Sequence, residues 1–320
     1  PLLNTKEIYD ENTLAHQYNF KKLILGTYQE SNTVDKSLYN FLIYLTKIIV
    51  QHSNILDIHV KNIRYAYKLM DDLNKNKVSI AYAPSPILYE SLIGGDIFGH
   101  KILHNIRFIS NINNVSIFFF VSNVGKVKSL YDLKGTNIGV VGDKSTSFKC
   151  ASDLLEQLEL DEDDYTFKYH SLMSGLDKLN NGIIDCFIYD AVFPSIDLKN
   201  YFEKNIGTSI RLLPLDEINE KTFISRFVYY EPIYLDLNKL SENYLPATVG
   251  EFKFNKYKSM LKTYSFHNYL LCHKSLDNNT SYNLIKSIYN NIDEINKLEL
   301  FRERPLFRNN IGWSSLSSDL

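Results

Sequence analysis

The chain has 320 residues, of which 44% are hydrophobic and 22% charged, an ordinary balance for a folded globular protein that excludes a disordered or collagen-like chain. The 35 basic and 37 acidic residues leave a net charge of -2, so no overall field would draw the protein to nucleic acid or anionic lipid. A chain of this length exceeds one ordinary core and fits two lobes, each with its own buried sheet.

The beginning of the chain is polar and is expected to form an N-terminal extension over residues 1–20. No apolar run approaches the ~20 residues of a membrane helix, so we expect no membrane insertion. The first 19 residues also lack the apolar stretch of a signal peptide. The compartment is therefore periplasmic or extracellular if a leader has been removed, and otherwise cytoplasmic or particle-associated.

Strands and helices alternate in the first third of the chain. An apolar strand over 22–25 ends at Gly26 and is followed by a loop over 27–32. Apolar residues at helical spacing from Val34 to Ile49 predict a long amphipathic helix. The next predicted elements are a strand over 55–60, a helix over 63–73 and a strand over 78–82. This alternation predicts a parallel sheet.

A similar series follows the apolar strand over 115–121. Strands are predicted over 138–141, 167–170 and 184–189, with a helix that starts near Phe148 and a helix over 175–179 between them. Segment 179–186 also resembles segment 73–80, because in both a helix ends at Asn or Gly and leads into a buried strand. The repeated pattern predicts two lobes of similar design.

These elements predict an α/β fold with two Rossmann-like lobes around a central cleft. Residues 21–113 and 265–320 would form lobe I, and residues 114–264 lobe II. Extended stretches over 118–122 and 266–273 would cross between the lobes and act as the hinge. Two parallel sheets would face each other with the carboxyl ends of their strands toward the cleft, where α/β sheets bind ligands.

The most informative motif is the loop over 142–147, between a short apolar strand and a helix. Such a loop places backbone N–H groups and hydroxyls at a helix N-terminus, which suits a small anionic or polar ligand. The same hydroxyls of Ser145, Thr146 and Ser147 would also cap the helix, and both readings stay open here.

The candidate ligand-binding residues lie in the loops after the predicted strands. They are Thr27, Tyr28, Ser31, Asn32, Tyr82, Ser85, Lys144, Ser145, Thr146, Ser147, Tyr189 and Asp190. The aromatic members would enclose a ligand or pack between the lobes. Asp190 would bind a cationic group, or pair with a lysine across the cleft such as Lys144.

Other chemistry has little support in the sequence. His100 and His104 have the spacing of a zinc pair on a helix, but the glycines before them favour a loop and no third ligand is evident. Cys150, Cys186 and Cys272 are far apart and are expected to be buried free thiols. The acidic run over 161–164 lacks the pattern of a calcium loop. We find no nucleophile elbow or phosphate loop and expect neither a cofactor nor a metal.

Four ordered motifs resemble the TAXI-type solute receptors of tripartite ATP-independent periplasmic (TRAP) transporters, within the two-lobed periplasmic binding proteins. They are DLKGTNIGVVGDKSTS at 132–147, LNNGIIDCFI at 179–188, IRLLPLD at 210–216 and LPATVG at 245–250. The resemblance runs from about Leu23 to Ile295. It implies a non-enzymatic periplasmic-binding-protein-like fold, a small polar ligand such as an amino acid or another carboxylate, and membrane transporter subunits as partners.

Departures from the family pattern keep two alternatives open. The family's first loop is rich in glycine, whereas Gly26 is followed here by TYQESN without another glycine, and Glu30 and Asp143 add negative charge to the two loops. One alternative is a non-transport descendant with a structural or protein-interaction role and a degenerate ligand site. The other is an enzyme related to pyrimidine-precursor proteins of this two-lobed class, with a histidine such as His170 in the site.

Overall fold

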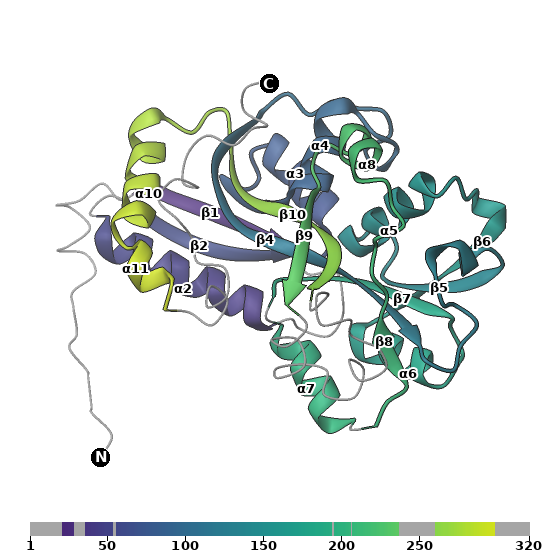
Figure 1. Ribbon diagram of the computed structural model, residues 1–320. Helices are drawn as coiled ribbons and strands as arrows, with labels where there is room; N and C mark the ends of the chain where they lie inside the picture. The colour runs from purple at the N-terminus through teal and green to yellow at the C-terminus, as the bar shows by residue number, and fades with distance from the viewer. Residues whose placement is uncertain are drawn as a thin grey trace, which may run out of the picture.

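The computed structural model describes residues 21–28, 36–53, 56–193, 195–205, 207–236 and 260–297. Its strands form one ten-stranded sheet, and eight of them follow the order β2-β1-β3-β10-β4-β7-β5-β6, while β8 pairs with β4 and β9 with β10. Helices cover both faces of this sheet (Figure 1). No described helix is long and apolar enough to span a bilayer. Cys150, Cys186 and Cys272 are free and buried, which confirms that prediction.

The first group of elements is built on three parallel strands: β1 (Lys21–Tyr28), β2 (Leu56–Ile63) and β3 (Ile80–Pro84). Apolar residues of α2 cover one face and those of α3 and α4 cover the other. The helices of this group are α2 (Lys36–His52), α3 (Ala66–Asn74), α4 (Ser85–Ile93), the short η1 (Asp96–Phe98), α10 (Asn278–Asn290) and α11 (Ile292–Ile295).

The second group repeats this plan. Strand β5 (Thr136–Val141) lies between β6 (Tyr165–His170) and β7 (Cys186–Ala191), and all three are parallel. Two short strands, β8 (Ile210–Leu212) and β9 (Glu231–Asp236), pair with the long strands described next. The helices are η2 (Leu130–Leu133), α5 (Thr146–Gln157), η3 (Glu162–Asp164), α6 (Leu172–Asn180), α7 (Ile196–Lys204) and α8 (Glu220–Arg226).

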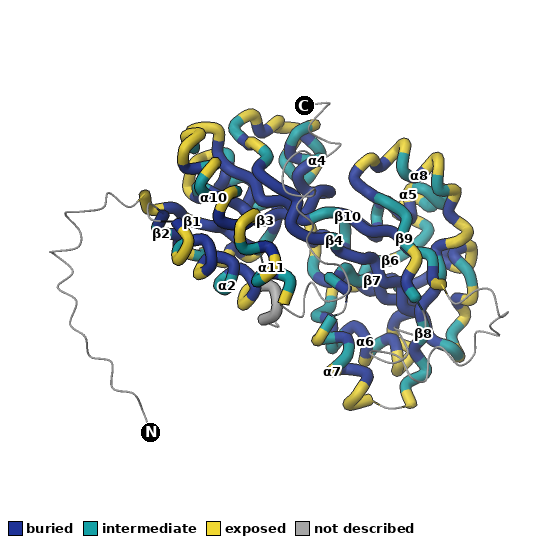
Figure 2. The backbone as a smooth tube through the Cα atoms, turned by 60° about the vertical axis from the view of Figure 1, so that its left-hand side comes forward, coloured by how far each residue is buried: buried dark blue, intermediate teal, exposed yellow. Residues whose placement is uncertain are grey.

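Two long antiparallel strands join the groups (Figure 2): β4 (Ile106–Ser122) and β10 (Met260–His273). The part of β4 from Ile106 to Ser116 pairs with β10, and its part from Ser116 to Val121 pairs with β7. In the same way, β10 pairs with β3 over 268–272 and with β9 over 260–265. The expectation of two separate sheets is therefore wrong, because these strands hydrogen-bond in both groups. The lobe boundaries at 113/114 and 264/265 stay a prediction.

The two groups share one continuous face of the sheet. Along β10, Tyr264 and Phe266 lie in the core beneath α5, whereas Leu270 and Cys272 lie in the core beneath α2. Because alternate residues of a strand point to the same face, Asn268 lies between these two cores on that face. The middle of the long strands is therefore where polar side chains interrupt an apolar sheet.

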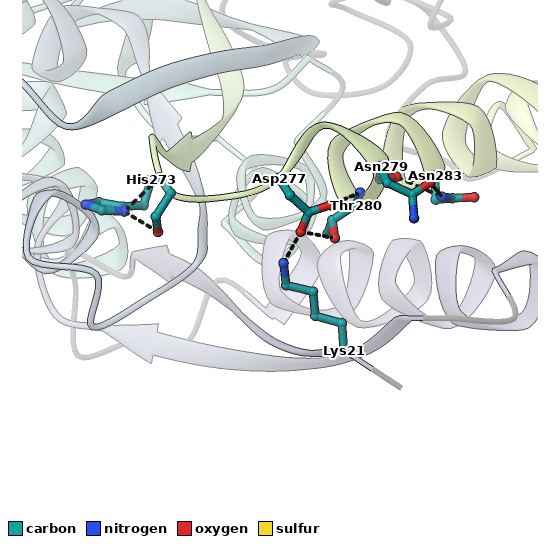
Figure 3. Close-up of polar contacts among 7 residues, drawn as sticks. Lys21, His273, Asp277, Asn279, Thr280 and Asn283 are labelled. Carbon is teal, nitrogen blue, oxygen red and sulfur yellow. Dashed lines mark hydrogen bonds and ion pairs between the residues drawn. The ribbon is translucent and has the colours of Figure 1, made fainter. Parts of the chain in front are cut away.

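The last helix is tied to the first described strand. Asp277 caps α10 by accepting hydrogen bonds of 2.8 Å from both the amide N and the hydroxyl of Thr280, and it also pairs with Lys21 at the start of β1 (Figure 3). The hydrogen bond from Lys21 and those from Thr280 hold the pKa of Asp277 below its ordinary value. This corner fixes the C-terminal elements onto the first group.

Candidate functional site

The polar loop after β5 has the predicted structure. Gly142 turns the chain with a φ of 67°, and α5 begins at Thr146, two residues before the predicted start. Ser145 caps the helix, because its hydroxyl accepts a hydrogen bond of 2.9 Å from the amide N of Phe148. Ser145, Thr146 and Ser147 are all buried. Capping by Ser145 is thus confirmed, while contact with a ligand stays a prediction.

Ser147 and Asp190 come together at the carboxyl ends of neighbouring strands. Strands β5 and β7 are parallel with Val140 beside Ile188, and the Ser147 hydroxyl donates a hydrogen bond to Asp190 Oδ1. Tyr189 points to the opposite face, where it packs in the core beneath α6 and its ring stacks at 6.4 Å on that of Phe187. Of the two residues predicted at this strand end, Asp190 is the one that meets the polar loop.

Lys144 reaches from this loop to the first group of elements. It is exposed, its φ is 55°, and its Nζ lies 5.8 Å from the ring centroid of Tyr67 in α3. A cation over an aromatic ring is attracted by the electrons of its face. The contact therefore connects the β5 loop to the first group, and sequence reasoning had not identified Tyr67.

In the first group, two predicted residues lie side by side on the face beneath α2. Thr27 and Tyr82 are both buried, and Thr27 continues a register in which Leu25 pairs with Ile80. Neighbouring residues of parallel strands point to the same face, so the Thr27 side chain lies beside that of Tyr82. Tyr28 is half-buried. Ser31 and Asn32 fall outside the described residues.

Tyr82 is the centre of an unpredicted polar cluster. Its hydroxyl donates to Asn113 Oδ1 of β4 and accepts a hydrogen bond of 3.0 Å from Asn268 Nδ2 of β10. Its ring contacts that of Phe41 in α2 at a centroid distance of 6.3 Å. We call Thr27, Tyr82, Asn113 and Asn268 the amide cluster. The signal in the sequence was asparagine inside two stretches that are rich in apolar residues.

Ser85 belongs to a different environment. It is the buried first residue of α4, and its hydroxyl accepts from the amide N of His267 at 3.3 Å and lies 3.4 Å from the carbonyl oxygen of Tyr229, to which it donates. These bonds engage the hydroxyl with the fold. A ligand contact for Ser85 stays a prediction.

A second buried polar cluster links α4 to α5. Lys149 Nζ lies 2.8 Å from both Glu90 Oε1 and Asp153 Oδ1, and the hydroxyls of Tyr229 and Tyr230 each donate to Asp153 Oδ2 at 2.8 Å. Burial raises the pKa of Asp153 to about 6 against the opposing effect of Lys149 and the two hydroxyls. We call these five residues the ionic cluster. Sequence reasoning did not identify it.

The histidines that the sequence offered for catalysis or metal binding lie in other surroundings. Nδ1 of His170, at the end of β6, lies 3.3 Å from Lys178 Nζ, and burial together with the Lys178 charge lowers the pKa of the imidazole. His100 has a φ of 59° and follows η1, so it does not share a helix with His104. Within the described ranges, no three His, Cys, Asp or Glu side chains gather as a metal-binding group.

Comparisons with known proteins agree with this architecture. A family model described as the NMT1-like family matches residues 38–304. A Xanthomonas citri protein bound to a chloride ion has a TM-score of 0.53 at 11% identity, covering 93% of this chain and 94% of that one. A chain from the structural study of glutathione import through GshT and the cystine ABC importer TcyBC of Streptococcus mutans has a TM-score of 0.52 at 11% identity, covering 94% of this chain and 100% of that one.

No curated protein sequence matches the chain. The structural likenesses give the fold, a mixed α/β architecture of the type II periplasmic-binding-protein class, which confirms the predicted fold class. Since the family model covers most of the chain, the protein belongs to the NMT1-like family and has a solute-binding-protein fold.

Proposed function

We propose that the protein is a non-enzymatic solute receptor that holds a small polar molecule where the two groups of strands meet. The observation that carries this proposal is that the polar side chains at the ends of β1, β3, β5 and β7 lie on one face of the continuous sheet.

The strand pairing of β4 supports the placement of these polar side chains on one face of the sheet. Ile117 pairs with Asp190, and Ile117 and Val115 both belong to the core beneath α5. Asn113 precedes Val115 by two residues in the same strand, so its side chain points to the same face as Val115. The Ser147–Asp190 pair and the amide cluster therefore flank one short apolar stretch from opposite sides.

The chemistry of the two flanks defines the expected solute. Asp190 carries a carboxylate and favours a positively charged group, such as the ammonium of an amino acid. The amide cluster is uncharged and suits the opposite end of the molecule. The four motifs of the sequence support the finer assignment, a TAXI-type receptor that delivers its solute to membrane transporter subunits, with closure of two lobes about β4 and β10.

A thermal-shift screen of amino acids, dicarboxylates and neutral amides tests the proposal. A specific solute at about 100 times its Kd stabilises the folded state by about 2.7 kcal/mol. Asp190→Asn and Ser147→Ala should each weaken that solute's binding about tenfold, the worth of about one charge-assisted hydrogen bond. Asp163→Asn, in the exposed acidic run, is the matched control and should bind as the parent does. A screen without any shift would contradict the proposal.

One observation favours the non-transport alternative. Glu90 of α4 and Lys149 of α5 form an ion pair of 2.8 Å between helices of the two groups, which opposes their separation. Small-angle X-ray scattering decides between the candidates, because a receptor should contract when the solute found by the screen is added. A structural descendant should keep the same radius of gyration with every compound tested.

A further inference from the structure

We propose that the amide cluster is a subsite for an uncharged group that carries both a hydrogen-bond donor and an acceptor, such as a carboxamide or a ureido group. This inference rests on the proposed function, since it names the class of solute that the same face would select.

Three atoms of the cluster have no hydrogen-bond partner among the residues that the structure describes. They are Thr27 Oγ1, Asn113 Nδ2 and Asn268 Oδ1, in side chains that are only 2%, 8% and 1% exposed. Buried polar atoms almost always have a partner, and each unmade bond lowers stability. Three such atoms, on the two amide partners of Tyr82 and on the neighbouring Thr27, therefore indicate a place where another molecule supplies the partners.

The available atoms are complementary to an amide. Asn113 offers a donor, Asn268 an acceptor, and the Thr27 hydroxyl can act as either. Because Tyr82 bonds to both asparagines, their orientations are linked. Reversing both bonds would leave Asn113 with the acceptor and Asn268 with the donor, which is the same combination. A carboxylate would meet an acceptor that it cannot satisfy, and an ammonium would meet a donor.

The side chains that make the hydrogen bonds of the cluster are themselves uncharged. Among the described residues, the side chains bonded within the cluster are a phenol and two amides, and the adjoining ring is that of Phe41. Burying a charge without a compensating partner costs far more than burying an amide. Selectivity for neutral over charged groups should therefore be strong.

Another buried threonine shows what a structural hydroxyl looks like in this sheet. Thr263 of β10 is as buried as Thr27, at 2% exposed, but its Oγ1 donates a hydrogen bond of 2.6 Å to the carbonyl oxygen of Ile117. The Thr27 hydroxyl has no such role among the described residues. Thr263 therefore provides a matched control for Thr27.

Isothermal titration calorimetry with two matched pairs of compounds tests the inference. L-glutamine is compared with L-glutamate, and L-citrulline with L-ornithine, because the members of each pair differ in whether the side-chain end is neutral or charged. We expect the neutral member to bind at least tenfold more tightly. Equal or tighter binding of the charged members would overturn the inference and leave the proposed function standing. No binding of any of the four would also overturn the inference, whereas the proposed function is judged by the thermal-shift screen.

Two variants and one control variant test whether the amide cluster causes the preference for neutral compounds. Thr27→Val keeps the shape of the side chain and should weaken binding of the neutral member about tenfold without lowering the melting temperature. Asn113→Asp keeps an acceptor for Tyr82 but replaces the donor, and should abolish the preference. Thr263→Val should lower the melting temperature and retain the preference. Parental affinity in Thr27→Val would overturn the inference, even if Asn113→Asp failed to fold.

Discussion

The ionic cluster and the amide cluster are both buried groups of polar side chains, and they differ in how completely they are bonded. In the ionic cluster, Asp153 contacts a lysine and two tyrosine hydroxyls, and the same lysine contacts Glu90. In the amide cluster, three atoms lack hydrogen-bond partners within the described part of the chain. A closed network serves the architecture, whereas an incomplete one leaves bonding capacity that a solute can use.

Replacing Asp153 tests the closed network with the largest expected effect. Asp153→Leu leaves the half-buried Lys149 and the hydroxyls of Tyr229 and Tyr230 without their shared acceptor. Breaking a buried ion pair by removing one partner costs about 3–5 kcal/mol. Urea unfolding should show this loss, while Asp163→Ala at an exposed position should change stability by less than ~0.5 kcal/mol. A loss in Asp153→Leu as small as that of the control would show that the network does not stabilise the fold.

The same carboxyl should make stability depend on pH. Burial raises its pKa from 3.8 to about 6, so the folded state binds this proton more tightly than the unfolded state. Its contribution is therefore full below pH 3.8 and is lost as the pH rises through about 6. At 1.36 kcal/mol per pKa unit, the difference is about 2–3 kcal/mol.

Unfolding curves of the parent and of Asp153→Asn between pH 4 and pH 8 isolate this contribution. Subtracting the two profiles removes the titration of other groups, and the difference should change across the window from pH 4 to pH 6. A difference that stays flat would show that Asp153 has an ordinary pKa and is ionised in the folded state throughout this range.

Tyr82→Phe probes the incomplete network. Removing the hydroxyl leaves Asn113 Oδ1 and Asn268 Nδ2 unpaired, in addition to the atoms that already lack partners among the described residues. Each unsatisfied buried group costs about 1–3 kcal/mol, and rotation of the freed amides toward each other offsets part of that cost. We expect a net loss of about 1–3 kcal/mol by urea unfolding. Tyr264→Phe, whose buried hydroxyl has no partner among the described residues, should lose less. A larger loss of stability in Tyr264→Phe than in Tyr82→Phe would show that the hydrogen bonds of Tyr82 do not stabilise the fold.

The sequence allowed the parallel strands and the β5 loop to be predicted because their signals are local. An apolar strand, a glycine and a run of hydroxyl residues at 138–147 produce the observed turn and helix cap. The helix α4 was not predicted, although Pro86 in its first turn is compatible with a helix start. The two clusters depend on contacts between residues far apart in the chain, such as Asp153 with Tyr229 and Tyr82 with Asn268, which no local pattern encodes.

The long strand β4 is a second case in which contacts between distant residues could not be predicted from a local pattern. Only 115–121 was predicted as a strand, because Asn111, Asn113 and Asn114 interrupt the apolar pattern before it. These asparagines are tolerated because each side chain bonds to a distant partner: Asn111 and Asn114 to His267, and Asn113 to Tyr82. The residues that broke the pattern are thus the ones that form the polar middle of the sheet.

The smallest expected effect gives the sharpest comparison, because it uses one substitution at two sites. In Thr263→Val, the Ile117 carbonyl loses a buried hydrogen bond, so stability should fall by about 1 kcal/mol. In Thr27→Val, no hydrogen bond among the described residues is lost and an unpartnered hydroxyl becomes a methyl group, so stability without solute should stay the same or rise. Urea unfolding of both variants measures the difference directly. Equal losses at both sites would mean that the Thr27 hydroxyl already has a structural partner, and the distinction between a closed and an incomplete network would no longer hold.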